Sequence, residues 1–298
     1  MQKSTVWLGS FAILCIMVGG FTGQSFLALM SAPVFLILLF LRGDWRFALT
    51  VLGIAFLLLG FSGDWLASTI LVLTAGGLSA ILGHGFRTNT LRAVIPLAVL
   101  VIVVYYLLIF VELRLAGYSV ASYMSHQALL FMEQSGQSGS LAGTTAADWL
   151  LAMEGDVNLY LPTFIAIFSI LVTLFEVVVV RFILRKDSAF QPLFRAIRFP
   201  LVVVVLFALS LLCVMAGIGE NLSLFWGLVN NLWLISTFLL ALQALSLLWW
   251  LLRTRPFAVA ILCVAVGLLT IPLVVEIYVL AGMTDVMFDI RKRIGQRH

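Results

Sequence analysis

Residues 93–112 read AVIPLAVLVIVVYYLLIFVE, twenty residues in which the only charged side chain is the final glutamate. Residues 161–180 and 199–219 are comparably apolar. An α-helix rises 1.5 Å per residue, so about 20 such residues cross the hydrocarbon core of a bilayer. Of the 298 residues, 63% are hydrophobic and 10% are charged, which is more apolar surface than a soluble domain of this length can bury. The sequence therefore predicts an all-α integral membrane protein, a polytopic bundle of transmembrane helices.

Nine apolar segments are predicted, with short charged gaps between them. Their ranges are 6–21, 26–41, 47–61, 65–83, 93–115, 161–184, 199–218, 225–252 and 257–281. We expect one membrane domain over 1–298, made of N-terminal spans (6–116), an excursion (117–160), C-terminal spans (161–282) and a basic tail (283–298). No stretch is long and polar enough for a separate soluble domain.

The gaps between segments alternate in charge. Twelve of the 17 basic residues fall in one set of gaps: Lys3, Arg42, Arg46, Arg87, Arg92, Arg181, Arg185, Lys186, Arg195, Arg198, Arg253 and Arg255. The opposite gaps hold mainly acidic residues. This asymmetry follows the positive-inside rule and places the N-terminus in the cytoplasm. The basic residues are thus topology signals, and we expect no nucleic-acid partner despite the net charge of +4.

The tail conflicts with nine crossings, because its basic residues would then lie outside. One segment is re-entrant, or the first two form one broken element around residues 19–23, or the tail is an outward exception. The prediction is therefore eight or nine spans.

The excursion at 117–160 has an amphipathic beginning. Within 118–133, Val120, Tyr123 and Phe131 fall near one helical face, while Ser119 and Ser122 fall near another. This pattern is typical of a helix that lies at the membrane interface, here on the extracytoplasmic side. Two interpretations stay open: a surface helix that closes the bundle, or a gate over an outward-facing cavity.

No motif for catalysis or for a cofactor is present in the sequence. The phosphate-binding pattern G-x-x-x-x-G-K-[ST] is missing, so the chain carries no ATP-driven motor of its own. The three histidines lack metal-ligand spacing, and the three cysteines are scattered through apolar segments. We expect no catalytic residue, no metal site and no cofactor, and hence no enzyme.

Polar side chains inside the apolar segments are the best pointers to function, because each is costly in hydrocarbon unless it is paired. Asn230, Asn231 and Gln243 lie in segment 225–252, and Glu276 lies in segment 257–281. Asn231 and Gln243, 12 residues apart, fall closer to a shared side of the helix than Asn230 and Gln243, which are 13 residues apart. The functional hypothesis is a polar patch of these four residues that binds substrate or a proton. The alternative for Glu276 is a carboxylate that reaches water at the outer end.

Two further features inside the segments have simpler interpretations. Glu176 lies toward the basic end of its segment, and we expect it to reach the cytoplasmic interface and pair with an arginine. Ala75, Ser79 and Gly83 recur every four residues, which predicts close packing between helix backbones.

The tail carries five residues with an expected structural or interaction role. They are Asp285, Asp289, Arg291, Lys292 and Arg293. If this stretch is helical, Asp289 and Arg293 form a favourable pair at a spacing of four, and Asp285 is placed to reach into the end of the bundle. A basic cluster beside the membrane indicates attraction to anionic lipid or a topology signal.

Three stretches of the second half resemble the YybS-like family of bacterial membrane proteins, a domain of unknown function. They are FRAIRFP at 194–200, NNLW at 230–233 with QALS at 243–246, and GMTDVMFDIRKR at 282–293. The family shows a basic residue before a span-opening proline, an Asn-Leu pair with a later Gln, and the ending G-x-x-D…F-D-x-R-K-R. Ala244 stands where glycine is expected, and the N-terminal half matches in hydropathy alone.

The resemblance implies a bacterial cytoplasmic (inner) membrane protein of about this length. It also implies distant kinship with the substrate-binding subunits of energy-coupling-factor vitamin transporters. Two functional hypotheses follow: a small-molecule transporter or substrate-binding membrane subunit, or a membrane scaffold or regulator that binds other proteins. The expected partners are the lipid bilayer and either a small-molecule ligand or a protein.

Overall fold

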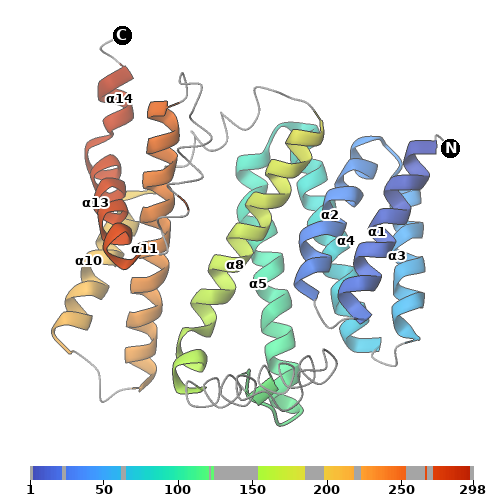
Figure 1. Cartoon of the computed structure of the whole chain (residues 1–298), viewed down its shortest axis with the longest axis horizontal. Helices are drawn as coiled ribbons and strands as arrows, with labels where there is room; N and C mark the ends of the chain where they lie inside the picture. The colour runs from blue at the N-terminus through green and yellow to red at the C-terminus, as the bar shows by residue number, and fades with distance from the viewer. Residues whose placement is uncertain are drawn as a thin grey trace. The chain divides into compact units, whose positions relative to one another are not determined.

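The computed structural model of the chain is helical, and it describes residues 3–21, 25–61, 65–120, 122–123, 154–184, 198–217, 223–252, 266 and 271–295 (Figure 1). Within these ranges no residue belongs to a strand. The all-α fold class predicted from the sequence is therefore confirmed. Most of the excursion, all of 185–197 and residues 296–298 of the tail lie outside these ranges, so the expected amphipathic helix and gate stay predictions.

The helices follow the predicted segments closely in most of the chain. In order they are α1 (Lys3–Phe21), α2 (Ser25–Leu41), α3 (Trp45–Gly60), α4 (Trp65–Thr88), α5 (Leu91–Leu115), α8 (Glu154–Ile183), α10 (Leu201–Met215), α11 (Ser223–Leu252), α13 (Pro272–Phe288) and α14 (Ile290–Gly295). Helix α8 starts before the predicted 161, because its first turns are polar and were not part of the apolar segment.

Several helices are long and apolar enough to cross a membrane. Among the described residues these are Trp65–Thr88, Ala93–Leu115, Leu159–Ile183 and Phe225–Leu252. Four further apolar helices are shorter: Ser4–Gly19, Leu27–Leu41, Trp45–Gly60 and Leu201–Met215. Large apolar side chains such as Leu73, at 69% exposure, face outward from these helices. That arrangement suits a protein whose surrounding solvent is lipid.

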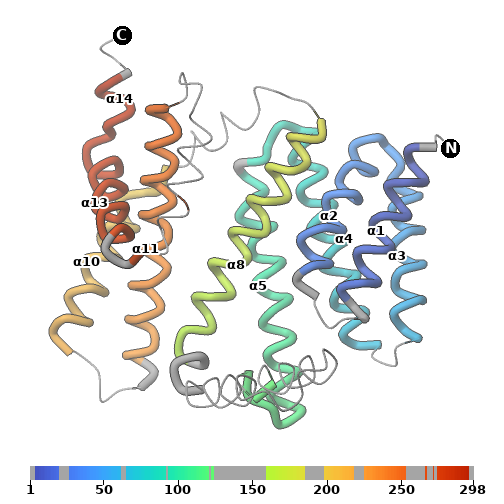
Figure 2. Tube along the Cα trace, in the orientation of Figure 1, coloured from blue at the N-terminus to red at the C-terminus, as the bar shows by residue number. Residues whose placement is uncertain are grey.

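The chain gathers into two compact units. Figure 2 traces the course of the chain from the N-terminus to the C-terminus. Unit 1 consists of Met1–Asn158 and Phe168–Lys186, and unit 2 consists of Leu159–Ile167 and Asp187–His298. Helix α8 therefore contributes Leu159–Ile167 to unit 2 and the rest of its length to unit 1.

In unit 1, α1 packs against α2 and α3, α2 packs against α4, and α4 packs against α3 and α5. The predicted small-residue face of α4 is buried, with Ala75 and Ser79 fully enclosed and Gly83 against Phe40 of α2. A side chain at Gly83 would crowd Phe40, which explains why this helix carries small residues where it meets α2.

The basic helix ends of unit 1 lie together. The Thr5 hydroxyl donates to the Asp44 carboxylate (3.0 Å), and Arg42 donates to the Ser4 hydroxyl (2.8 Å). These bonds hold the start of α1 beside the turn between α2 and α3, and Figure 1 shows the turn between α4 and α5 at the same end. Within unit 1 the alternation of basic ends expected from the sequence is thus reproduced.

In unit 2, α10 and α13 both pack on α11, but in opposite directions. Phe199, just before α10, contacts Gln243 of α11. Further along α10, Val203 and Val204 cluster with Leu240, which precedes Gln243 in α11. Helices α10 and α11 are therefore antiparallel. Gly282 of α13 lies against Leu240, and Asp285 contacts Gln243. From the first of these contacts to the second, the residue numbers increase along both helices, from Leu240 to Gln243 in α11 and from Gly282 to Asp285 in α13. Helices α11 and α13 therefore run parallel.

The prediction of one continuous segment over 257–281 was wrong. Helix α13 begins at Pro272, after an extended Ile271, and it continues to Phe288. Proline lacks a backbone N–H and disfavours helical geometry in the residue before it, so it suits the first turn of a new helix. The first residues of the predicted tail are consequently part of α13.

Candidate functional site

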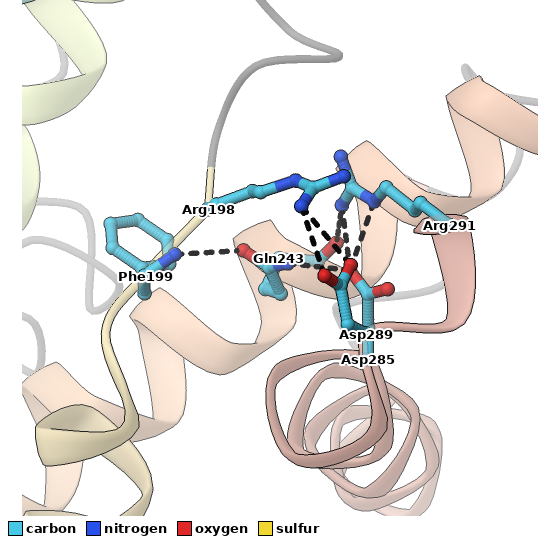
Figure 3. A network of polar contacts seen from close by, with 6 residues as sticks. All are labelled: Arg198, Phe199, Gln243, Asp285, Asp289 and Arg291. Carbon is cyan, nitrogen blue, oxygen red and sulfur yellow. Dashed lines mark hydrogen bonds and ion pairs between the residues drawn. The ribbon is translucent and has the colours of Figure 1, made fainter. Parts of the chain in front are cut away.

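Unit 2 contains a buried polar network at the end where α11 and α13 stop (Figure 3). We call Phe199, Gln243, Asp285 and Arg291 the α11–α13 network. The Asp285 Oδ2 atom accepts hydrogen bonds from Gln243 Nε2 (2.5 Å) and Arg291 Nε (3.0 Å), and it forms an ion pair with Arg291 Nη2 (2.9 Å). The other carboxylate oxygen, Oδ1, has no hydrogen-bond partner among the described residues. Gln243 Oε1 in turn accepts from the Phe199 backbone N–H (3.2 Å). The Asp285 carboxylate of α13 thereby contacts both α14, through Arg291, and α11, through Gln243. The Gln243 side chain in turn connects α11 to the residue that precedes α10.

The turn that follows α13 makes this network possible. Asp289 caps the helix in a left-handed conformation (φ 45°), which redirects the chain into α14 and brings Arg291 back onto Asp285. Both side chains of that ion pair are only 2% exposed. Burial lowers the pKa of the Arg291 guanidinium, and the Asp285 carboxylate beside it acts in the opposite direction.

A second ion pair lies beside the first in Figure 3 and joins Asp289 to Arg198, with Nη1 3.0 Å from Oδ1. This pair is about half exposed. The pair between Asp289 and Arg293 that the sequence predicts is not the one observed. The left-handed cap at Asp289 turns its side chain toward Arg198. Arg293 lies over the Phe288 ring, with its guanidinium carbon 5.8 Å from the ring centre.

Asn231 forms a separate clasp with the early part of α8, also within unit 2. Its Oδ1 accepts from Thr163 N (3.1 Å) and Thr163 Oγ1 (2.6 Å), while its Nδ2 donates to Leu159 O (2.6 Å) and Gly227 O (2.7 Å). In a regular helix Thr163 N would donate to Leu159 O, but Pro162 interrupts that ladder. The amide of Asn231 is inserted at the interruption and satisfies both backbone groups.

These bonds engage every donor of the Asn231 amide and two acceptor positions of its oxygen. A substrate would have to displace some of them to reach this side chain. Asn230 donates to Trp226 O of its own helix (2.8 Å) and is 5% exposed.

The predicted patch of Asn230, Asn231, Gln243 and Glu276 does not come together. Asn231 bonds to α8, Gln243 bonds to the α11–α13 network, and Glu276 is exposed on α13. Gln243 instead joins Asp285 and Arg291, which the sequence had placed in a different group. Of the other members of that group, Asp289 is half-buried and Lys292 and Arg293 are exposed on α14.

Unit 1 holds a different kind of buried carboxyl group. Glu176 of α8 is 0% exposed, and neither of its oxygens has a hydrogen-bond partner in the described part of the chain. The expectation that Glu176 reaches the interface and pairs with an arginine was wrong. Its helix is rotated so that Glu176 points into the protein, and Leu171, Phe175 and Phe182 occupy the exposed side.

Ser169, Thr173 and Glu176 share one face of α8, and we call them the α8 polar stripe. All three are fully buried, and the Thr173 hydroxyl donates back to Ser169 O (2.9 Å). Their spacing of four and then three residues is the repeat of one helical face, a signal that was present in the sequence and was missed. A helix that turns polar groups inward and large apolar groups outward is built for a lipid surrounding with a polar interior.

A second buried polar group of unit 1 lies on α5. The ring of Tyr106 meets the edge of Phe168 on α8, with the centres 5.6 Å apart. Its hydroxyl is buried and has no hydrogen-bond partner among the described residues. Within the described part of unit 1, Glu176 and Tyr106 are thus two buried polar side chains that make no hydrogen bond.

A family model described as "Predicted membrane protein (DUF2232)" matches residues 10–286. The chain belongs to this family. The matched range includes the α8 polar stripe, the Asn231 clasp, Gln243 and Asp285, and it ends before Arg291. Comparison with curated proteins and with solved structures gave no match. The family description establishes a membrane protein and leaves the activity to be argued from the sites.

Proposed function

We propose that this membrane protein is a small-molecule transporter or the substrate-binding membrane subunit of one, and that Glu176 contacts the transported molecule. The observation that supports this is a fully buried carboxyl group with two unpartnered oxygens in an apolar helix. Polar groups buried without a partner cost about 1–3 kcal/mol each, and charged ones cost more. A protein retains such a loss of stability where the buried group binds a ligand reversibly.

The chemistry of the site favours a particular class of molecule. A carboxyl group with free oxygens accepts hydrogen bonds and, when ionised, attracts positive charge. The neighbouring Ser169 and Thr173 add hydroxyl groups along the same face. We infer that the transported molecule presents a proton, an amine or another hydrogen-bond donor to Glu176.

The energy source has to lie outside this chain, since the sequence has no ATP-binding motif. A proton gradient or a separate ATPase would serve. The YybS-like resemblance and its implied kinship with energy-coupling-factor subunits favour the ATPase, supplied by another protein. A stable complex with an ATPase after purification in mild detergent supports that arrangement, and uptake by the reconstituted chain alone under a proton gradient contradicts it.

We further propose that both ends of the chain face the cytoplasm of a bacterial inner membrane. In unit 2, the Arg198–Asp289 pair and the parallel course of α11 and α13 put the start of α14 at the end where α10 begins, beside Arg198. This removes the conflict between the basic tail and the positive-inside rule. A reporter fused after His298 is expected to be active in the cytoplasm, and an external tail would overturn the proposal.

The function is tested by ligand-induced stabilisation of the purified protein. A panel of amines, amino acids and vitamins is screened for a rise in melting temperature, and a ligand at 100 times its Kd stabilises by about 2.7 kcal/mol. Glu176→Gln should abolish the response to the active compound. Glu276→Gln makes the same chemical change at an exposed position and should preserve it. No response to any compound, or equal loss in both variants, contradicts the proposal.

The alternative function, a scaffold or regulator for other proteins, rests on a different observation. Lys292 and Arg293 are exposed on α14, which the buried Arg291 anchors. A partner protein that co-purifies with the wild type and is lost from Lys292→Gln/Arg293→Gln, while Glu176→Gln keeps it, would favour this alternative.

A further inference from the structure

Helix α14 of unit 2 presents a small basic surface, and a buried ion pair fixes the orientation of this helix. We call Lys292, Arg293, Phe288 and Ile294 the α14 surface. Arg291 is buried against Asp285, so α14 is held by one side chain and turns its other residues outward. Lys292 and Arg293 are exposed, and so are the apolar side chains of Phe288 and Ile294.

The charges at this end are not balanced. Arg291 is neutralised by Asp285, and Arg198 is neutralised by Asp289. Lys292 and Arg293 form no ion pair with any described residue. Two cations therefore stand next to exposed apolar groups, with the Arg293 guanidinium placed over the Phe288 ring.

The position of these cations relative to the membrane follows from the helix that carries them. Lys292 comes four residues after Phe288, the last residue of α13. Because Asp289 redirects the chain there, the ion pair between Arg291 and Asp285 (2.9 Å) keeps α14 beside the last turn of α13. The cations thus lie at the level of lipid headgroups if α13 enters the hydrocarbon, while Phe288 and Ile294 lie at the boundary.

We propose that the α14 surface binds the headgroups of anionic phospholipids. The phosphate and its neighbours supply the negative charge that Lys292 and Arg293 lack, and the acyl chains cover Phe288 and Ile294. Basic residues beside a membrane each strengthen binding to anionic lipid by about fivefold at low salt. The two together are expected to give a preference of about 25-fold over a neutral lipid.

The test measures lipid preference in bilayers that contain the full chain. Spin-labelled phosphatidylglycerol and spin-labelled phosphatidylcholine are compared by electron paramagnetic resonance, which reports the fraction of each lipid that is immobilised by the protein. The wild type should prefer phosphatidylglycerol, and Lys292→Gln/Arg293→Gln should lose most of that preference. Lys292→Arg/Arg293→Lys preserves the charge and should retain it.

A matched control separates this surface from general surface charge. Arg42→Gln/Arg46→Gln also removes two exposed basic side chains at a helix end, but in unit 1. It should leave most of the preference intact. An equal loss in both double variants, or no preference in the wild type, would overturn the proposal. Neither result bears on ligand binding at Glu176, which is measured separately by thermal shift.

Discussion

Asp285 in unit 2 and Glu176 in unit 1 are both carboxyl groups buried on helices, yet they differ in their partners. Oδ2 of Asp285 accepts hydrogen bonds from Gln243 and Arg291, and the charge is matched by Arg291, while Oδ1 has no partner among the described residues. Neither oxygen of Glu176 has a partner among the described residues. A buried polar group that is paired stabilises the folded structure, whereas one that is left unpaired needs another explanation, such as the reversible binding of a ligand. The comparison therefore distinguishes a structural ion pair from the carboxyl group that we propose as the functional site.

The largest effect is expected where a single substitution unpairs a buried charge. Arg291→Met leaves the Asp285 carboxylate without its counter-ion and should destabilise the protein by about 3–5 kcal/mol. Chemical denaturation in detergent measures this. The double variant Asp285→Leu/Arg291→Met removes both charges and should recover more than half of the loss. A double variant as unstable as the single one would show that the pair is not acting as a unit.

Next comes the clasp between Asn231 and α8. Asn231→Leu leaves Thr163 N and Leu159 O without partners, because Pro162 prevents them from rejoining a regular ladder, and should cost about 2–3 kcal/mol. Asn230→Leu is the matched control, since it removes one bond to its own helix and should cost about 1 kcal/mol or less. Equal losses at the two positions in the same denaturation experiment would contradict the bridging role.

Glu176→Gln should have a small effect on stability and a large one on function. The substitution removes no hydrogen bond made by the described residues, so the unfolding free energy should change by less than about 1 kcal/mol. The ligand response should nevertheless disappear. A large loss of stability would place Glu176 in the same structural class as Asp285, and the contrast between the two units would fail.

The smallest effect is expected at the exposed ion pair. Arg198 and Asp289 have side chains that are 52% and 45% exposed, so water and salt screen their attraction. Arg198→Gln should cost about 0–1 kcal/mol and should lose even that in high salt. A cost comparable to that of Arg291→Met would show that the two pairs act as one network.

The sequence predicted the elements better than their contacts. Hydropathy located most helices because a membrane span needs a continuous apolar stretch, as α5 shows. It failed at α13, where the apolar run continued through Pro272 and hid the start of a new helix. It also missed that Gln243, Asp285 and Arg291 converge, since their meeting depends on α11 and α13 running parallel, which local pattern does not encode.

Glu176 illustrates a different limit. Its place near several arginines indicated an interfacial pair, but the direction of a side chain depends on how the whole helix is rotated against its neighbours. The repeat formed with Ser169 and Thr173 carried that information, and the three residues together would have predicted an inward face.

The parallel course of α11 and α13 has a consequence for how the protein is made. Gln243 and Asp285 are 42 residues apart, so at 5–20 residues per second the ribosome delivers the carboxylate roughly two to eight seconds after the amide. During that interval the Gln243 side chain has entered a nascent bundle without the acceptor it will use. Unit 2 is thus assembled late, and a chaperone or insertase that shelters α11 during this delay would raise the yield of folded protein.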